Sequence, residues 1–206
     1  INGNIKWFVC FQGYTKDKGM FDYWETLPNK QISKYLENWI NKHLNNKPYT
    51  GCINIETIDD IIIDCHLRMG DVNQLYFNKK SDVVIKSIIN IYTGKEKFSP
   101  ELLDYTIPKI YLVPIFISYN SKVYLNYNEL KDICNKIDTE GEYIYSYQLD
   151  PPQENSFNPI GGIRIANITT NNLDIGFKVR REILELINLK KIYRYAKIVC
   201  YVILIL

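Results

Sequence analysis

The sequence lacks the features by which several classes of protein are known. No apolar run reaches the about 20 residues that a membrane-spanning helix needs, and the charges of both signs are interspersed, with a formal net charge of +2. We therefore predict neither a membrane nor a nucleic-acid partner. Because 46% of the 206 residues are hydrophobic, the chain can bury a core of ordinary size, which excludes a disordered or fibrous protein.

The cysteines lack the number and spacing of a disulfide framework or a zinc knuckle. They are odd in number and widely separated, at Cys10, Cys52, Cys65, Cys134 and Cys200. This pattern favours a reducing compartment, so we predict a cytoplasmic protein. An initiating Met is also lacking, since Ile1 opens directly onto a strand-like run, and we expect further residues upstream.

Hydrophobic periodicity is present along most of the chain and predicts an α+β fold. Strands are expected at residues 5–11, 51–56, 61–67, 110–119, 122–126, 142–149 and 162–170, and helices at 32–44, 81–92, 129–137 and 173–191. Residues 13–29 are expected to form a loop. The apolar stretch 196–206 is expected to be a buried strand or the artefact of a truncated end.

Two neighbouring strands carry an unusual set of polar residues. Side chains alternate between faces along a strand, so Asp64, His66 and Arg68 share one face of the second strand. The alternate residues, from Ile61 to Leu67, form an apolar face that we expect to lie toward the core. Glu56 joins the polar face only if the turn between the strands has an odd number of residues; an even-numbered turn would put it on the wrong face.

This residue set matches the chemistry of a divalent cation site. Mg²⁺ prefers hard oxygen ligands and is commonly held by one or two carboxylates plus nucleotide phosphates, a role that fits Glu56 and Asp64. His66 is a softer third metal ligand, which suggests that Mn²⁺ is accepted too. Arg68 is the candidate catalytic residue, because a guanidinium can neutralise charge on a transferred phosphoryl group. A ladder of structural ion pairs across the hairpin is the competing interpretation.

The same stretch resembles the end of an ATP-grasp domain. In that family a helix is followed by a Gly-led strand that carries an acidic residue or Gln, and then by a strand with the pattern Glu-x-Asn-Pro-Arg. Residues 49–56 (YTGCINIE) resemble the first strand and residues 62–68 (IIDCHLR) the second. The likeness covers roughly residues 30–70.

The resemblance carries over residue by residue. Glu56 stands where the first metal ligand of the family would be, Asp64 stands for the Glu, His66 for the Asn and Arg68 for the Arg, whereas Leu67 replaces the Pro. It implies an ATP-grasp-like antiparallel sheet with packed helices in residues 1–78, followed by an α+β extension in residues 79–206. It also implies that Glu56 and Asp64 bind the cofactors ATP and Mg²⁺.

The activity implied is the ATP-dependent joining of a carboxylate to an amine, or a similar nucleophile, through an acyl-phosphate. The substrates would be small-molecule or peptide carboxylates and amines. A second hypothesis is a non-catalytic interaction or structural protein with a degenerate ATP-grasp fold, which the replacements at Asp64 and His66 permit. A third, a metal-dependent phosphodiesterase or nuclease, is less favoured, because the chain has no basic, aromatic-rich groove.

Overall fold

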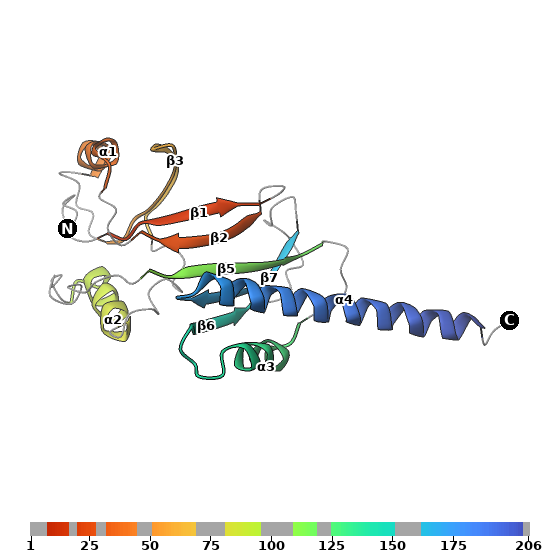
Figure 1. Cartoon of the computed structure of the whole chain (residues 1–206). Helices are drawn as coiled ribbons and strands as arrows, with labels where there is room; N and C mark the ends of the chain where they lie inside the picture. The colour runs from red at the N-terminus through yellow and green to blue at the C-terminus, as the bar shows by residue number, and fades with distance from the viewer. Residues whose placement is uncertain are drawn as a thin grey trace. The chain divides into compact units, whose positions relative to one another are not determined.

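The computed structural model has a mixed α+β fold with an antiparallel sheet and four helices among the residues it describes (Figure 1). These are residues 8–16, 20–27, 32–44, 51–68, 81–95, 109–118, 125–150 and 162–203, without the side chains of 81–84, 87 and 192–203. The chain forms two compact units: a hairpin unit, residues 1–10 and 27–108, and a sheet unit, residues 11–26 and 109–206. The units are thus interleaved along the sequence, whereas the predicted division is a single boundary after residue 78.

The described residues of the hairpin unit form two helices and a two-stranded sheet. Its elements are α1 (Lys34–Leu44), β3 (Asn54–Ile58), β4 (Ile61–His66) and α2 (Ser81–Tyr92). All four lie where the periodicity predicts them. Tyr92 at the end of α2 connects to the segment that leads into β3, because the backbone N–H of Cys52 donates to its hydroxyl over 2.7 Å.

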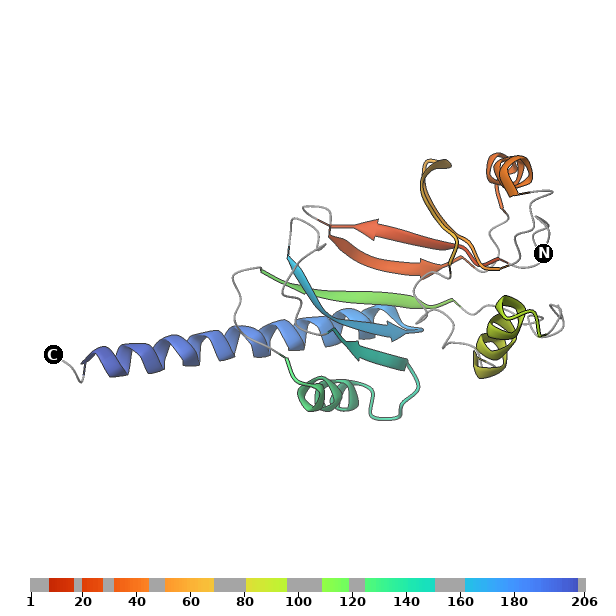
Figure 2. The ribbon, with the colours of Figure 1, turned by 180° about the vertical axis from the view of Figure 1, so that it is seen from behind.

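The sheet unit is built on five antiparallel strands in the order β1-β2-β5-β7-β6 (Figure 2). Its elements are β1 (Phe11–Thr15), β2 (Phe21–Thr26), β5 (Tyr111–Ile117), α3 (Tyr127–Ile137), β6 (Ile144–Leu149), β7 (Ile163–Thr170) and α4 (Leu173–Ile203). The most buried strands, β5 and β7, lie inside the sheet and not at its edges. The alternate residues Val113, Ile115 and Ile117 of β5 share one face, which belongs to the buried core.

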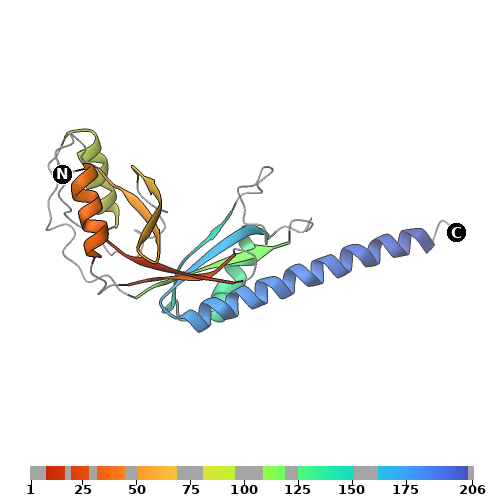
Figure 3. The same ribbon diagram turned by 90° about the horizontal axis from the view of Figure 1, so that it is seen from above.

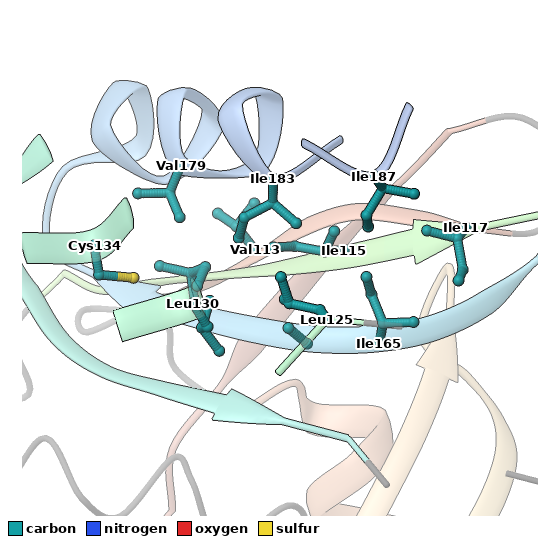
Figure 4. Packing of buried hydrophobic residues seen from close by; sticks show 12 residues of the cluster. Val113, Ile115, Ile117, Leu125, Leu130, Cys134, Ile165, Val179, Ile183 and Ile187 are labelled. Carbon is teal, nitrogen blue, oxygen red and sulfur yellow. The ribbon is translucent and has the colours of Figure 1, made fainter. Parts of the chain in front are cut away.

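The core of the sheet unit lies between the sheet and α4, which runs along one face of the strands (Figure 3). Val179, Ile183 and Ile187 are spaced four residues apart and point from α4 toward Val113 and Ile115 of β5 (Figure 4). All five are at most 1% exposed. Residues four apart lie on one side of a helix, so the spacing alone explains which side of α4 is buried.

Close approach of α4 to the sheet depends on Gly176. A Cβ at this position would lie 2.7 Å from Cγ2 of Val113 and 3.1 Å from Cγ2 of Thr170, both of which are fully buried. The first turn of α4 can therefore touch the sheet only with glycine here.

Helix α3 is fixed at its start and tied to α4. Asn126 and Glu129 form a capping box, in which each side chain accepts from the backbone N–H of the other residue. The Glu129 carboxylate also pairs with Lys190 of α4, whose Nζ lies 2.6 Å from Oε2. One carboxylate thus caps α3 and anchors it to its neighbour.

Residues 13–29 are not the single loop that the sequence suggested, because they include most of the β1–β2 hairpin. Gly13 pairs with Trp24 across the two strands, and a Cβ on Gly13 would lie 2.9 Å from the Trp24 ring. The indole therefore covers the glycine, and an isolated Gly in a strand is explained by the aromatic opposite it. Arg180 of α4 fixes the same hairpin by donating to the backbone oxygen (2.8 Å) and Oδ1 (2.7 Å) of Asp22.

Three other sequence predictions need correction. Residues 8–10 are not in a strand, and β1 starts at Phe11; residues 5–7 lie outside the described part of the chain. Of the predicted strand 122–126, only 125 and 126 are described, and Asn126 is a helix cap. The last helix does not end at 191 but continues to Ile203, so residues 196–203 are helical and not a strand. None of the helices, over their described residues, is long and apolar enough to cross a membrane.

Candidate functional site

The polar residues predicted on the hairpin do come together on one face. In the β3–β4 pair, Glu56 lies directly opposite Asp64, and Asn54 lies directly opposite His66. Directly opposed residues of an antiparallel pair project from the same face, and residues two apart on a strand share that face. The four side chains, which we call the polar quartet, therefore form a two-by-two array.

The route to this register differs from the predicted one. The turn is even-numbered, since Ile58 pairs with Ile61 and only Asp59 and Asp60 lie between them, both with positive φ (49° and 64°). Such a turn is typical of a tight hairpin. With regular pairing after this two-residue turn, Glu56 would lie opposite Ile63. A bulge corrects the register, because Thr57 pairs with Ile62 and Glu56 with Asp64, leaving Ile63 as the extra residue. The prediction that only an odd-numbered turn brings Glu56 onto the polar face was therefore wrong.

Hydrogen bonds link neighbours within each strand of the polar quartet. Nδ2 of Asn54 donates to Oε1 of Glu56 over 3.3 Å. Nε2 of His66 lies 3.0 Å from Oδ2 of Asp64, whose Oδ1 accepts the backbone N–H of Cys65 at 2.7 Å. Each carboxylate oxygen has two lone pairs, so Asp64 keeps acceptor capacity for another ligand.

The polar quartet places two carboxylates opposite each other on an exposed hairpin. Two carboxylates placed directly across a strand pair repel one another, and Asp64 and His66 are accessible, with 52% and 35% of their side chains exposed. Among the described residues no group of three His, Cys, Asp or Glu side chains is arranged to hold a metal ion. The predicted trio of Glu56, Asp64 and His66 is therefore not preformed as a three-ligand site, since Nε2 of His66 is directed at Asp64. A site of two carboxylates remains, with Asn54 as a polar neighbour.

The face expected to lie toward the core is largely exposed. Ile61, Ile63 and Leu67 have 64%, 57% and 56% of their surfaces exposed, so the prediction of a core-facing side was wrong for these residues. The bulge explains part of the difference, because the alternation of faces shifts at Ile63. Arg68 lies two residues after His66, the last residue of β4, and is exposed.

A second polar cluster, which the sequence interpretation missed, lies in the sheet unit. Glu25 of β2 has only 11% of its side chain exposed; Tyr14 of β1 donates to its Oε1 over 2.6 Å, and Nζ of Lys109 lies 3.0 Å from its Oε2. The Tyr14 hydrogen bond lowers the pKa of Glu25, partly opposed by burial, and Lys109 lowers it further. The bond to Glu25 raises the pKa of Tyr14 to about 12. The alternation of Phe21, Tyr23 and Glu25 was the available signal for a strand here.

This second cluster has the character of a structural ion pair. Tyr14 stacks on Tyr23 with ring centroids 4.4 Å apart, and Tyr23 meets Phe177 of α4 at 5.8 Å. The Glu25 carboxylate thus lies beside the aromatic cluster of Tyr14, Tyr23 and Phe177. One of its oxygens accepts from Tyr14 and the other pairs with Lys109. The polar quartet, with its exposed and opposed carboxylates, is the stronger candidate for ligand binding.

Comparisons with known proteins identify no family for this chain. No model of a protein family matches the chain, and no curated protein or solved structure is similar to it. The likeness to ATP-grasp domains therefore rests on residues 49–68 and stays a prediction.

Proposed function

We propose that the chain is part of an ATP- and Mg²⁺-dependent ligase of the ATP-grasp type. The observation that carries the proposal is the direct pairing of Glu56 with Asp64 on one accessible face of the β3–β4 hairpin. The family resemblance implies that an acidic residue or Gln on the first strand, here Glu56, meets an acidic residue on the second. A two-residue turn alone would have prevented this, and the bulge at Ile63 restores it.

The residues present fit a magnesium ion held by two carboxylates. Mg²⁺ needs only one or two carboxylates when nucleotide phosphates supply further oxygens, so a preformed trio is not required. In this proposal Glu56 and Asp64 hold the ion, and His66 orients the Asp64 carboxylate through its 3.0 Å contact. When bound, the ion neutralises charge on the nucleotide phosphates. Mn²⁺ is an alternative occupant, since an imidazole adjoins the site.

The proposed reaction joins a carboxylate to an amine in two steps. The substrate carboxylate takes the terminal phosphoryl group of ATP, which gives an acyl-phosphate and ADP; the amine then attacks the acyl carbon and releases phosphate with loss of a proton. Arg68 is the proposed catalytic residue, because its guanidinium can neutralise the negative charge on the phosphoryl group during its transfer. Small-molecule or peptide acids and amines are the proposed substrates. A cytoplasmic location is part of the proposal, supported by the free thiols of Cys65 and Cys134.

Calorimetric titration of the 206-residue chain with ATP, in excess Mg²⁺ and then in excess EDTA, tests the proposal. We expect binding that requires the metal. The variant Glu56→Gln/Asp64→Asn removes both anionic ligands while keeping side-chain size. It should weaken binding by at least about tenfold, the typical loss when even an outer-shell partner of a metal is removed.

A matched control lies on the same hairpin. Asp59→Asn/Asp60→Asn removes the same two charges from the turn, and Asn tolerates the positive φ found there. This variant should bind as the unaltered chain does. Equal loss in both variants would mean that general charge, and not the polar quartet, attracts the nucleotide. Absence of Mg²⁺-dependent binding to the unaltered chain would reject the ligase.

A non-catalytic interaction protein is the second candidate, and the exposed isoleucines of the hairpin favour it. Ile58, Ile61 and Ile63 are each more than half exposed, and a two-stranded hairpin has little stability by itself. In that case the chain would bind no nucleotide. Ile61→Thr would then weaken association with a protein partner, whereas under the ligase proposal it leaves nucleotide affinity unchanged.

A further inference from the structure

Helix α4 is longer than its packing in the sheet unit requires. It runs from Leu173 to Ile203, 31 residues, and continues past the strands toward the end of the chain (Figure 1, Figure 3). Ile187 is the last α4 residue of the buried core among those whose burial is described. The next two residues, Asn188 and Leu189, are exposed.

The apolar side of α4 changes after Ile187. Toward the end of the helix, apolar residues recur at alternating spacings of three and four residues, at Leu189, Ile192, Ala196, Val199 and Ile203. Each residue of an α-helix turns by about 100°, so a series that starts two residues after Ile187 lies on roughly the opposite side from the core-facing residues. Leu189 is accordingly 52% exposed.

The charge of this segment is of one sign. Residues 186–206 contain the basic residues Lys190, Lys191, Arg194 and Lys197 and no Asp or Glu. Lys190 pairs with Glu129. By helical spacing, Lys190, Arg194 and Lys197 fall on the side opposite the apolar series. Ile198 and Tyr201 fall among these basic residues, so the second half of α4 has a basic side that is interrupted by apolar residues and an opposite side without charge.

We propose that the segment Leu189–Ile203 docks on the surface of an anionic lipid membrane. A helix with a basic polar side and a broad apolar side lies in the plane of the interface, with the apolar side buried and the basic residues at the headgroups. Tyr193, Tyr195 and Tyr201 fit this location, because tyrosine is enriched at the membrane interface. The proposal revises the prediction of no membrane partner, which considered only spanning segments; a helix on the surface needs no spanning length.

A second copy of the helix fits less well as the occupant. In paired helices the positions that flank the apolar seam usually carry opposite charges. Here those positions are Tyr193, Tyr195, Cys200 and Val202, so the apolar side is wider than a two-helix seam. The basic residues also have no acidic counterparts in the segment, whereas an anionic lipid surface supplies them.

Vesicle flotation with the 206-residue chain tests the proposal. Vesicles of phosphatidylcholine alone are compared with vesicles in which one lipid in three is phosphatidylserine. We expect the chain to float with the anionic vesicles only, and to detach as the salt concentration rises. Arg194→Gln/Lys197→Gln, which keeps good helix-forming residues, should lower the partition coefficient about thirtyfold, since each basic residue near such a surface contributes roughly fivefold.

The matched control is on the same helix with the same spacing. Lys178→Gln/Arg181→Gln removes two exposed basic residues from the first half of α4 and should leave flotation unchanged. Ile192→Gln/Val199→Gln should also reduce binding, because the apolar side must enter the interface. Equal losses in the control pair, equal binding to neutral vesicles, or concentration-dependent self-association in sedimentation velocity without flotation would each overturn the proposal.

Discussion

The hairpin unit and the sheet unit differ most in how completely they bury their side chains. In the sheet unit the side chains of Val113, Ile115, Leu130, Val179 and Ile183 are fully buried in one cluster. In the described part of the hairpin unit only Ile40 is buried, at 6% exposed, and Ile58, Ile61 and Ile63 of β3 and β4 are more than half exposed. The polar quartet thus belongs to the unit with the smaller described core.

This difference shows that the two units acquire their stability in different ways. Apolar burial contributes roughly 25 cal/mol for each Å² removed from water, and the sheet unit gains it from α4 and α3 on the sheet. The described hairpin gains little from burial, and its carboxylates repel each other. Ligand binding to a folded state adds stability by mass action, so the hairpin unit has more to gain from a bound cation or nucleotide than the sheet unit does.

The largest expected effect is a cavity in the sheet unit. Ile183→Ala deletes part of a fully buried side chain and should lower the free energy of unfolding by about 3 kcal/mol. The same substitution at Ile61 of β4, which is 64% exposed, should change it by less than about 0.5 kcal/mol. Urea denaturation followed by circular dichroism measures both. Similar losses at the two positions would remove the contrast between the units.

A buried and an exposed aspartate of the sheet unit, Asp138 and Asp132, can be compared in the same way as Ile183 and Ile61. The Asp138 carboxylate, at the end of α3, accepts the backbone N–H groups of Glu142 (3.1 Å), Tyr143 (3.0 Å) and Ile144 (2.7 Å) and so fixes the start of β6. Asp138→Ala leaves these donors without their acceptor and should cost about 2 kcal/mol in the same denaturation experiment. Asp132→Ala on the exposed side of α3 is the control and should have no measurable effect.

The acid stability of the sheet unit should depend on Glu25. Its folded-state pKa is lowered, first by the Tyr14 hydrogen bond and further by Lys109, although burial opposes the shift. A lowered pKa means that the stabilisation is fully present above the unfolded pKa, near 4.5, and is lost as the pH falls through the folded value. Glu25→Gln should therefore flatten the pH dependence of unfolding in this acid range. Glu140→Gln, an exposed control, should leave the slope unchanged.

The smallest expected change in stability is at the polar quartet. Whether the variant is more or less stable distinguishes a ligand site from a structural ladder. Without metal, Glu56→Gln/Asp64→Asn removes two like charges that face each other, and should stabilise the β3–β4 pair by roughly 0.2–1 kcal/mol. With MgATP present, the amides of the unaltered hairpin should exchange more slowly than those of the variant, because only the unaltered hairpin binds the ion. Amide hydrogen exchange of β3 and β4 measures both states. A destabilised variant without metal would support a structural ladder instead.

Local patterns sufficed for much of the secondary structure. The apolar spacing in α1 and α2 and the strand patterns of β5 to β7 are properties of neighbouring residues, and their elements were confirmed. The β1–β2 hairpin was missed because Gly13 resembles a loop residue until the Trp24 ring opposite it is known. The buried Glu25 has two partners, Tyr14 and Lys109, that are far from each other in sequence, so no local pattern could reveal them.

The sequence by itself determined which polar residues share a strand face, since alternation follows from backbone geometry. It also determined that the charged residues of 186–206 are all basic, but not that α4 continues through residues 192–203, the last part of which was expected to be a strand. Only the tertiary structure decided that Glu56 lies opposite Asp64, because a bulge changes the register of a strand pair without leaving a local signature. It also decided that α4 docks through Ile183 and Ile187 while Leu189 remains exposed, because the length of the sheet, and not the helix, determines where packing ends.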